Sequence, residues 1–102
     1  MARQAASSQV QRDDDEVRAT LWSFSPGTET GWHRHEYPYI VVPVLGGRLT
    51  VEDNAGSRAY PIVGGQSYSR PAGVEHNIAN DTEAEIAFVE IEIKTPEPPF
   101  RQ

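Results

Sequence analysis

The sequence predicts an all-β fold, a single-domain antiparallel β-barrel or jelly-roll sandwich. Short segments rich in β-branched and aromatic residues alternate between apolar and polar positions, which is typical of strands. Glycine- and proline-containing turns separate these segments at regular intervals, and no segment sustains the 3.6-residue period of a helix. The length of 102 residues fits one domain.

The predicted strands follow one another along the chain. In the first, 17–25, Val17, Ala19 and Leu21 share one face. The apolar run 39–45 reads as a strand buried on both faces, and Pro43 inside it indicates an edge position or a bulge. Asn54-Ala55-Gly56 is predicted to be a hairpin loop. Further strands are expected at 48–53, 57–63 (interrupted by Pro61), 75–79 and 85–94, the last with Ile86, Phe88, Glu90 and Glu92 on one face.

Both ends of the chain differ in composition from this central unit. Residues 1–16 are polar, close on an acidic run and show no periodicity, so the sequence predicts a disordered arm. The tail 95–102 is rich in proline and is expected to be extended. The folded unit is therefore predicted to be 17–94, a small domain whose thin core favours support from a metal or a partner subunit.

Composition excludes several classes of function. The net charge of −6 and the nine scattered basic residues argue against a nucleic-acid partner. The absence of cysteine excludes disulfides and thiolate metal sites. No apolar run approaches the length of a membrane span, and no secretory signal is visible. We therefore expect a cytoplasmic protein that does not act at a membrane.

Two of the three histidines stand one residue apart, in the segment "WHRHEY". Side chains alternate along a strand, so His33 and His35 project from the same face and Arg34 projects from the other. Two imidazoles on one strand face are a common way to offer neutral nitrogen ligands to a divalent metal. The alternative is a pair of ordinary surface or core histidines without a ligand role.

The third histidine, His76, lies in "GQSYSRPAGVEHNIAN", which has the spacing G-x5-P-x-G-x2-H-x3-N. Gly65 and Gly73 permit turns with positive φ, and Pro71 restricts the chain that enters the second turn. Asn80 can close a turn with its side chain. His76 is therefore expected to begin a new strand and to point inward.

These two segments resemble the two motifs of the cupin superfamily. The first motif is G, five residues, H-x-H, three or four residues, E, six residues, G; this chain matches it at Gly27, His33, His35 and Gly47. The second motif is matched at every fixed position of 65–80. The resemblance implies a jelly-roll barrel with both motifs at one mouth, and it implies metal ligation by His33, His35 and His76.

The chain departs from the first motif at its glutamate. That position falls on Ile40 or, with the shorter spacing, on Tyr39. Glu36 and Glu75 adjoin histidines and are expected to face away from the site. The predicted site is thus three histidines completed by water or substrate, with Tyr39 as a possible fourth metal ligand. Three neutral imidazoles leave the full charge of the ion at the site, which favours an anionic ligand.

Tyr37 and Tyr39 continue the alternation of His33 and His35. They are candidate catalytic residues that would line the pocket as hydrogen-bond donors, and the alternative for each is a place in an aromatic core. Glu90 and Glu92 would be candidates for a general base if their strand face is interior, because burial raises a carboxyl pKa. The alternative is that both lie on a solvated face.

The resulting hypothesis is a small metal-dependent enzyme of oxygenase, isomerase or lyase type that acts on a small anionic or polar molecule. The cofactor would be a divalent transition metal, with iron, zinc, nickel and manganese all compatible with histidine ligands. One alternative is a non-catalytic module that binds a metal and a small ligand, and another is a structural barrel whose histidines bind nothing. Similar cupins are commonly dimers, so a homodimer is expected.

Overall fold

The computed structural model describes residues 2–95, and within this range every regular element is a β-strand. The predicted proline-rich tail lies outside the described residues except for Thr95. No helix in the described range is long and apolar enough to cross a membrane. The strands are β1 (Gln4–Ala5), β2 (Ser7–Asp13), β3 (Val17–Phe24), β4 (Thr28–Glu29), β5 (His33–Arg34), β6 (Tyr39–Leu45), β7 (Gly47–Asp53), β8 (Gly56–Ile62), β9 (Tyr68–Arg70), β10 (Glu75–Asn80) and β11 (Ile86–Ile93).

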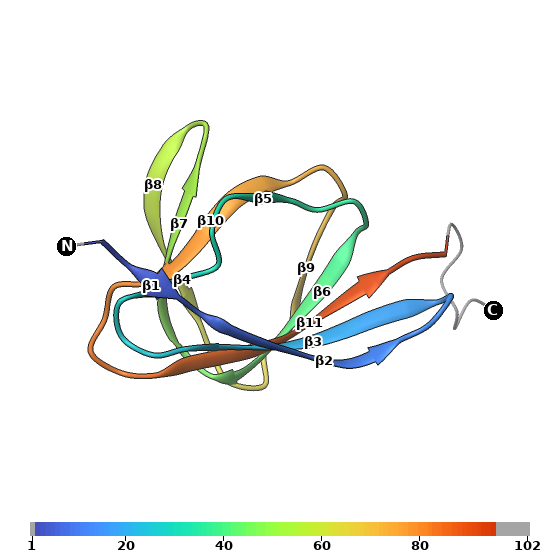
Figure 1. The fold of residues 1–102 in the computed structure, drawn as a ribbon, viewed down its shortest axis with the longest axis horizontal. Coiled ribbons are helices and arrows are strands. Elements are labelled where there is room, and N and C mark those ends of the chain that lie inside the picture. Colours follow the sequence, from blue (N-terminus) through green and yellow to red (C-terminus); the bar gives the residue numbers. More distant parts are fainter. Residues whose placement is uncertain (1, 96–102) are drawn as a thin grey trace.

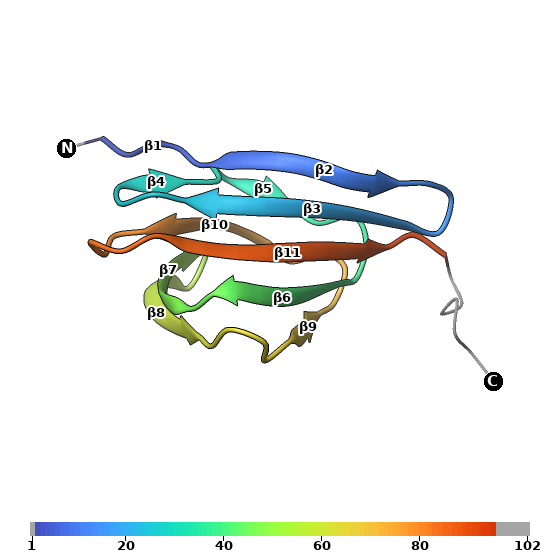
Figure 2. The same cartoon turned by 90° about the horizontal axis from the view of Figure 1, so that it is seen from below.

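The strands form two facing sheets (Figure 1). One has the order β2-β3-β11-β6-β9, and these strands lie side by side in Figure 2. The other has the order β1-β4-β10-β7-β8, with β5 also paired to β10. The prediction of an all-β jelly-roll sandwich is confirmed. The alternative of a closed barrel is not, since the two sheets keep separate edges among the described strands.

The hydrophobic core fills one end of the space between the sheets. Phe24, Leu49 and Ile86 are almost completely buried there, and Phe24 pairs across the sheet with Ile86. The ring of Phe24 also packs against Phe88, with ring centroids 5.4 Å apart. Because β11 alternates as predicted, Ile86 and Phe88 share this interior face with Glu90 and Glu92 further along the strand. The inward face of β11 is therefore apolar at its start, in the core, and acidic toward its end.

The bulge predicted near Pro43 is present. The register between β6 and β11 shifts between Ala87 and Phe88, so that Val44 has no partner opposite it. The expectation that 39–45 is buried on both faces is wrong. Tyr39, Val41 and Pro43 point inward and are buried, whereas the residues between them are only partly covered. Within residues 2–95 no second layer packs on the outer face of this sheet.

The N-terminal segment differs from the disordered arm predicted for residues 1–16. Strand β2 pairs antiparallel with β3, and β1 pairs in parallel with β4. All seven residues of β2 are exposed, so the strand carries no hydrophobic pattern that a sequence could reveal. Backbone pairing holds it, and Arg3 anchors the chain start through ion pairs with Glu29, Glu52 and Asp81 at 2.9–3.1 Å.

Candidate metal centre

Two neighbouring strands bring the three histidines together. Strand β5 pairs antiparallel with β10, and His33 lies directly opposite His76 in this register. The pairing continues beyond β5, because the backbone N–H of His35 donates to the carbonyl of Val74 and the carbonyl of His35 accepts from Gly73. Gly73 and Gly65 have positive φ, as predicted for the turns of the second motif.

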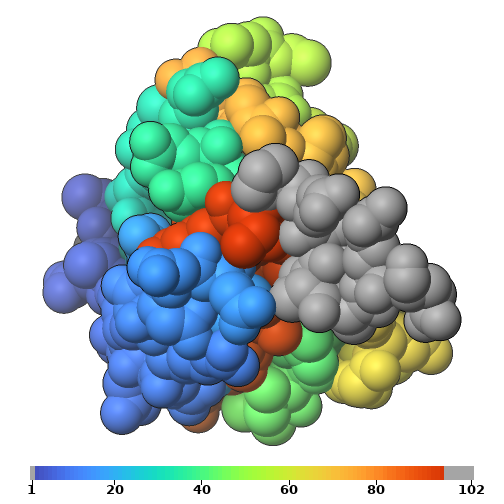
Figure 3. All heavy atoms as spheres, turned by 90° about the vertical axis from the view of Figure 1, so that its right-hand side faces the viewer, coloured from blue at the N-terminus to red at the C-terminus, as the bar shows by residue number. Residues whose placement is uncertain are grey.

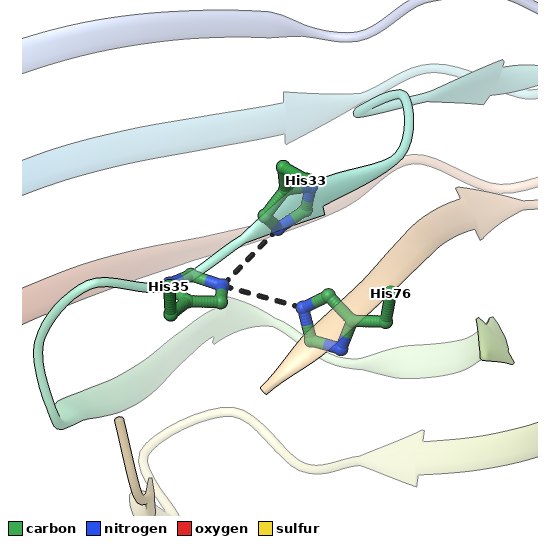
Figure 4. A group of neighbouring side chains, drawn as sticks. All are labelled: His33, His35 and His76. Carbon is green, nitrogen blue, oxygen red and sulfur yellow. Dashed lines mark hydrogen bonds between the residues drawn. The ribbon is translucent and has the colours of Figure 1, made fainter. Parts of the chain in front are cut away.

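The three imidazole Nε2 atoms converge on one point (Figure 4). The Nε2 of His35 lies 3.1 Å from that of His33 and 3.3 Å from that of His76. Metal–nitrogen bonds are about 2.1 Å long, so two nitrogens bound to one ion lie at most about 4.2 Å apart. Both distances satisfy this limit. The donor set and its spacing therefore fit a divalent transition metal.

The loop before β5 orients the first histidine. The Nδ1 of His33 lies 2.8 Å from the carbonyl oxygen of Gly31, so the ring donates through Nδ1 and keeps the Nε2 lone pair for the site. The loop is held in turn by Asn77, whose side-chain oxygen accepts from the backbone N–H of Gly31 at 2.9 Å. A backbone acceptor behind the ligand ring is the usual arrangement for a metal-binding histidine.

Burial keeps the other two histidines neutral. Desolvation, followed by the neighbouring imidazoles, lowers the pKa of His35 to about 3. Desolvation is also the main cause that lowers the pKa of His76 to about 4. Both side chains are at most 8% exposed. At neutral pH they therefore present lone pairs, which is the protonation state that metal binding needs.

The position of the missing glutamate is occupied by an inward-facing tyrosine. Tyr39 is 3% exposed, and its ring stacks on the imidazole of His35 with centroids 3.9 Å apart and planes 20° apart. Burial raises the pKa of the Tyr39 hydroxyl. Ile40 belongs to the opposite face of the strand. Tyr39 covers the face of the His35 ring and so restrains its orientation, whereas the Nε2 atom of His35 would be the one to hold a metal.

Tyr37, the other tyrosine candidate, lies half-buried in the connection between β5 and β6. It is not among the residues that line the pocket beside the histidines. Glu36 and Glu75 are exposed, as expected for residues that adjoin inward-facing histidines.

A pocket of about 330 Å³ opens beside His33 and His35. Figure 3 views the end of the molecule where β11 (orange-red) lies between the β2–β3 segment (blue) and the segment around β5 (teal). The sequence left open whether Glu90 and Glu92 face the interior, and both line this pocket. The remaining lining residues come from β2, β3 and the β4–β5 region: Ser8, Val10, Arg18, Thr20, Trp22, Thr30 and Arg34. The sequence did not predict the contribution of Ser8 and Val10 from β2, because it predicted a disordered arm there.

The two glutamates differ in their surroundings. Arg18 donates to Glu92 at 3.2 Å. Glu90 approaches His35, with its Oε2 3.9 Å from the histidine Nε2. Desolvation and then the charge of Glu92 raise the pKa of Glu90 to about 7. The pocket thus holds one carboxylate with a cationic partner and one beside the histidines.

The protein is thus a small jelly-roll β-sandwich in which three histidines lie together, as the two motifs predict. Comparison with known families agrees with this class. The model of the cupin domain family matches residues 20–92, and the chain belongs to this family.

Two well-matched relatives support the assignment. The chain is 53% identical over 85 residues to the "Beta-alanine degradation protein BauB" of Pseudomonas aeruginosa. The aligned residues cover 83% of this chain and 90% of the relative. It is also similar to the crystal structure of a cupin domain from Bordetella pertussis Tohama I. That match has a TM-score of 0.90 and 49% identity, and it covers 93% of this chain and 99% of the other.

A more distant match reports on the fold alone. A cupin superfamily protein from Desulfitobacterium hafniense DCB-2 has a TM-score of 0.69 at 20% identity, with 93% of this chain and 84% of the other covered. The sandwich architecture is therefore retained at low sequence identity.

Proposed function

We propose that this protein is a small metal-dependent enzyme in which His33, His35 and His76 hold a divalent transition metal. The observation that carries the proposal is the convergence of the three Nε2 atoms, at 3.1 and 3.3 Å around His35. A divalent ion held by neutral imidazoles supplies Lewis-acid or redox chemistry to a bound substrate. Iron, zinc, nickel and manganese all suit this ligand set, and an oxygenase, isomerase or lyase reaction would fit it.

The pocket favours a small molecule that carries ionised groups. Its lining offers the carboxylates of Glu90 and Glu92 and the guanidinium groups of Arg18 and Arg34. Trp22 provides an apolar surface next to these charges. The chain's own residues would bind and orient such a molecule against the histidines, since a volume of about 330 Å³ suits only a small ligand.

The named relative suggests which molecule this is. The Pseudomonas aeruginosa relative is named as a β-alanine degradation protein. β-Alanine carries an ammonium and a carboxylate group, and the pocket carries charges of both signs. We place this protein's reaction in the breakdown of β-alanine, with β-alanine or a small acid derived from it as substrate.

Metal analysis tests the site. The protein purified without added metal is expected to contain close to one transition-metal ion per chain, and His76→Ala is expected to lose most of it. His76→Asn keeps a polar side chain at this position, so it serves as a second variant if His76→Ala does not fold. Glu75→Gln is the matched control because Glu75 is adjacent and exposed. Unchanged metal content in both His76 variants would refute the ligand assignment.

Turnover tests the reaction. The protein loaded in turn with Fe²⁺, Zn²⁺, Ni²⁺ or Mn²⁺ is mixed with β-alanine and with other small acids and sugars. Oxygen uptake with the iron form would indicate an oxygenase, and product formation without oxygen uptake would indicate an isomerase or lyase. Saturable binding without any product would instead favour the alternative, a non-catalytic module that binds a metal and a small ligand.

We also infer a cytoplasmic homodimer. Strand β2 ends the order of its sheet and is exposed over its whole length, which leaves a strand edge for a second copy among the described residues. Static light scattering at low concentration is expected to give twice the chain mass, and a monomer mass would contradict the dimer.

A further inference from the structure

The candidate metal centre lacks a carboxylate at the expected place in the chain, but a carboxylate lies near it in space. Tyr39 fills the inward position of the motif glutamate and stacks on His35, and Ile40 belongs to the other face. Neither side chain supplies an anionic ligand at neutral pH. If the site has a carboxylate, it must come from a strand other than β6.

The neighbouring strand β11 provides it. Glu90 lies opposite Val41 and Glu92 lies opposite Tyr39, so both glutamates share the inward face of β6. The Oε2 atom of Glu90 is 3.9 Å from the Nε2 of His35. Two ligand atoms on one ion lie at most about 4.2 Å apart, so this separation is within the range of shared coordination.

Of the two glutamates, only Glu92 has an arginine or lysine partner among residues 2–95. Glu92 accepts a hydrogen bond from Arg18 at 3.2 Å. Among residues 2–95, no group donates a hydrogen bond to the carboxylate of Glu90, although its side chain is only 13% exposed. A carboxylate in this position keeps only part of its hydration, and a bound cation would compensate for the part that it loses.

We infer that Glu90 is the fourth protein ligand of the metal and replaces, from β11, the glutamate that the first motif lacks. This inference rests on the proposed histidine site. The histidine triad and the His35–Glu90–Glu92 group share His35, and Glu90 would join the triad if its side chain turned toward the point on which the three Nε2 atoms converge. The ligand set then carries one negative charge, which reduces the net charge that a divalent ion leaves at the site from two to one.

The test compares Glu90→Gln with the wild-type chain and with Glu85→Gln as the matched control, since Glu85 is exposed and immediately precedes the same strand. Affinities for Zn²⁺ and Co²⁺ are measured by competition with a chelator, and the visible absorption of the Co²⁺ form reports the ligand field. Glu90→Gln is expected to weaken binding at least about tenfold and to change the Co²⁺ bands. Glu85→Gln is expected to leave both the affinity and the Co²⁺ bands unchanged.

A measurement on the metal-free protein separates ligation from a structural role. Without metal, Glu90→Gln is expected to unfold at the same temperature as the wild-type chain or above it, because a buried unpaired carboxylate has been removed. A residue that merely supported the fold would instead lower the unfolding temperature when it is changed.

The outcomes distinguish this inference from the proposed function. A wild-type chain that binds neither ion refutes both. A wild-type chain that binds, together with a Glu90→Gln variant of equal affinity and identical Co²⁺ bands, refutes only the fourth ligand. Weaker binding with unchanged bands also refutes ligation, because it shows that Glu90 acts on the ion through charge alone.

Discussion

The two ends of the space between the sheets share strands β3 and β11 but differ in the kind of side chain that they bury. At the closed end, Phe24, Leu49 and Ile86 belong to one cluster of buried apolar side chains. At the open end, Glu90 and His35 stand near each other with little access to solvent. Strand β11 contributes to both ends, and its inward face changes from apolar to acidic after Phe88.

The apolar end of the molecule accounts for stability, and the polar end accounts for binding and chemistry. Burial of apolar side chains at the closed end supplies the free energy of folding. The open end contains polar groups whose desolvation opposes folding, and such groups are retained where they bind or react with something. Substitutions at the two ends should therefore affect different measurements.

The largest effect is expected at the closed end. Phe24→Ala removes a completely buried ring that contacts Phe88, so it should lower the free energy of unfolding by about 3–5 kcal/mol. Chemical denaturation of the metal-free protein measures this loss. Val63→Ala, at a position that is 54% exposed, is the control and should change stability by less than about 0.5 kcal/mol. A loss of similar size in both variants would contradict the assignment of the core.

An intermediate effect is expected from pH at the open end. His35 and His76 have pKa values lowered to about 3 and about 4, from 6.5. The unfolded chain therefore binds more protons at these two sites between pH 6.5 and about 4, and the metal-free protein should lose stability as the pH falls through this window.

Glu90 opposes this trend. Its pKa is raised from 4.5 to about 7, so between these values the folded chain holds a proton that the unfolded chain releases, and stability falls as the pH rises. Two histidines outweigh one glutamate, so the net stability still increases from pH 4.5 to 6.5. Glu90→Gln should steepen this increase in denaturation curves, and an unchanged slope would show that Glu90 does not titrate in this window.

The smallest effect is expected from Tyr39→Phe. The substitution keeps the ring that stacks on His35 and removes only the hydroxyl. If Tyr39 restrains the imidazole without ligating the metal, the affinity for Zn²⁺ should stay within about threefold of the wild-type value. Tyr39→Leu, which loses the stack, should weaken binding more. A large loss in Tyr39→Phe alone would instead identify the hydroxyl as a ligand.

Sequence reasoning succeeded where the signal was local. Alternation predicted β3, β7 and β11, and a short apolar run predicted β6, each to within about one residue of the observed ends. The proline in β6 also indicated the bulge beside it. It failed for β2, whose exposed side chains leave no pattern because its pairing uses only backbone groups. It also overestimated the burial of β6, since the composition of a strand does not reveal whether a second layer covers its outer face.

The sequence by itself determined that two histidines share one strand face and that a third, within a glycine- and proline-spaced motif, points inward. These properties follow from the two-residue period of a strand and from the backbone freedom of particular turns, which neighbouring residues set. Only the tertiary structure decided that His76 lies opposite His33, that Tyr39 stacks on His35, and that Glu90 of β11 lies 3.9 Å from His35. Such contacts depend on sheet order and register, which arise from pairing between segments far apart in the chain.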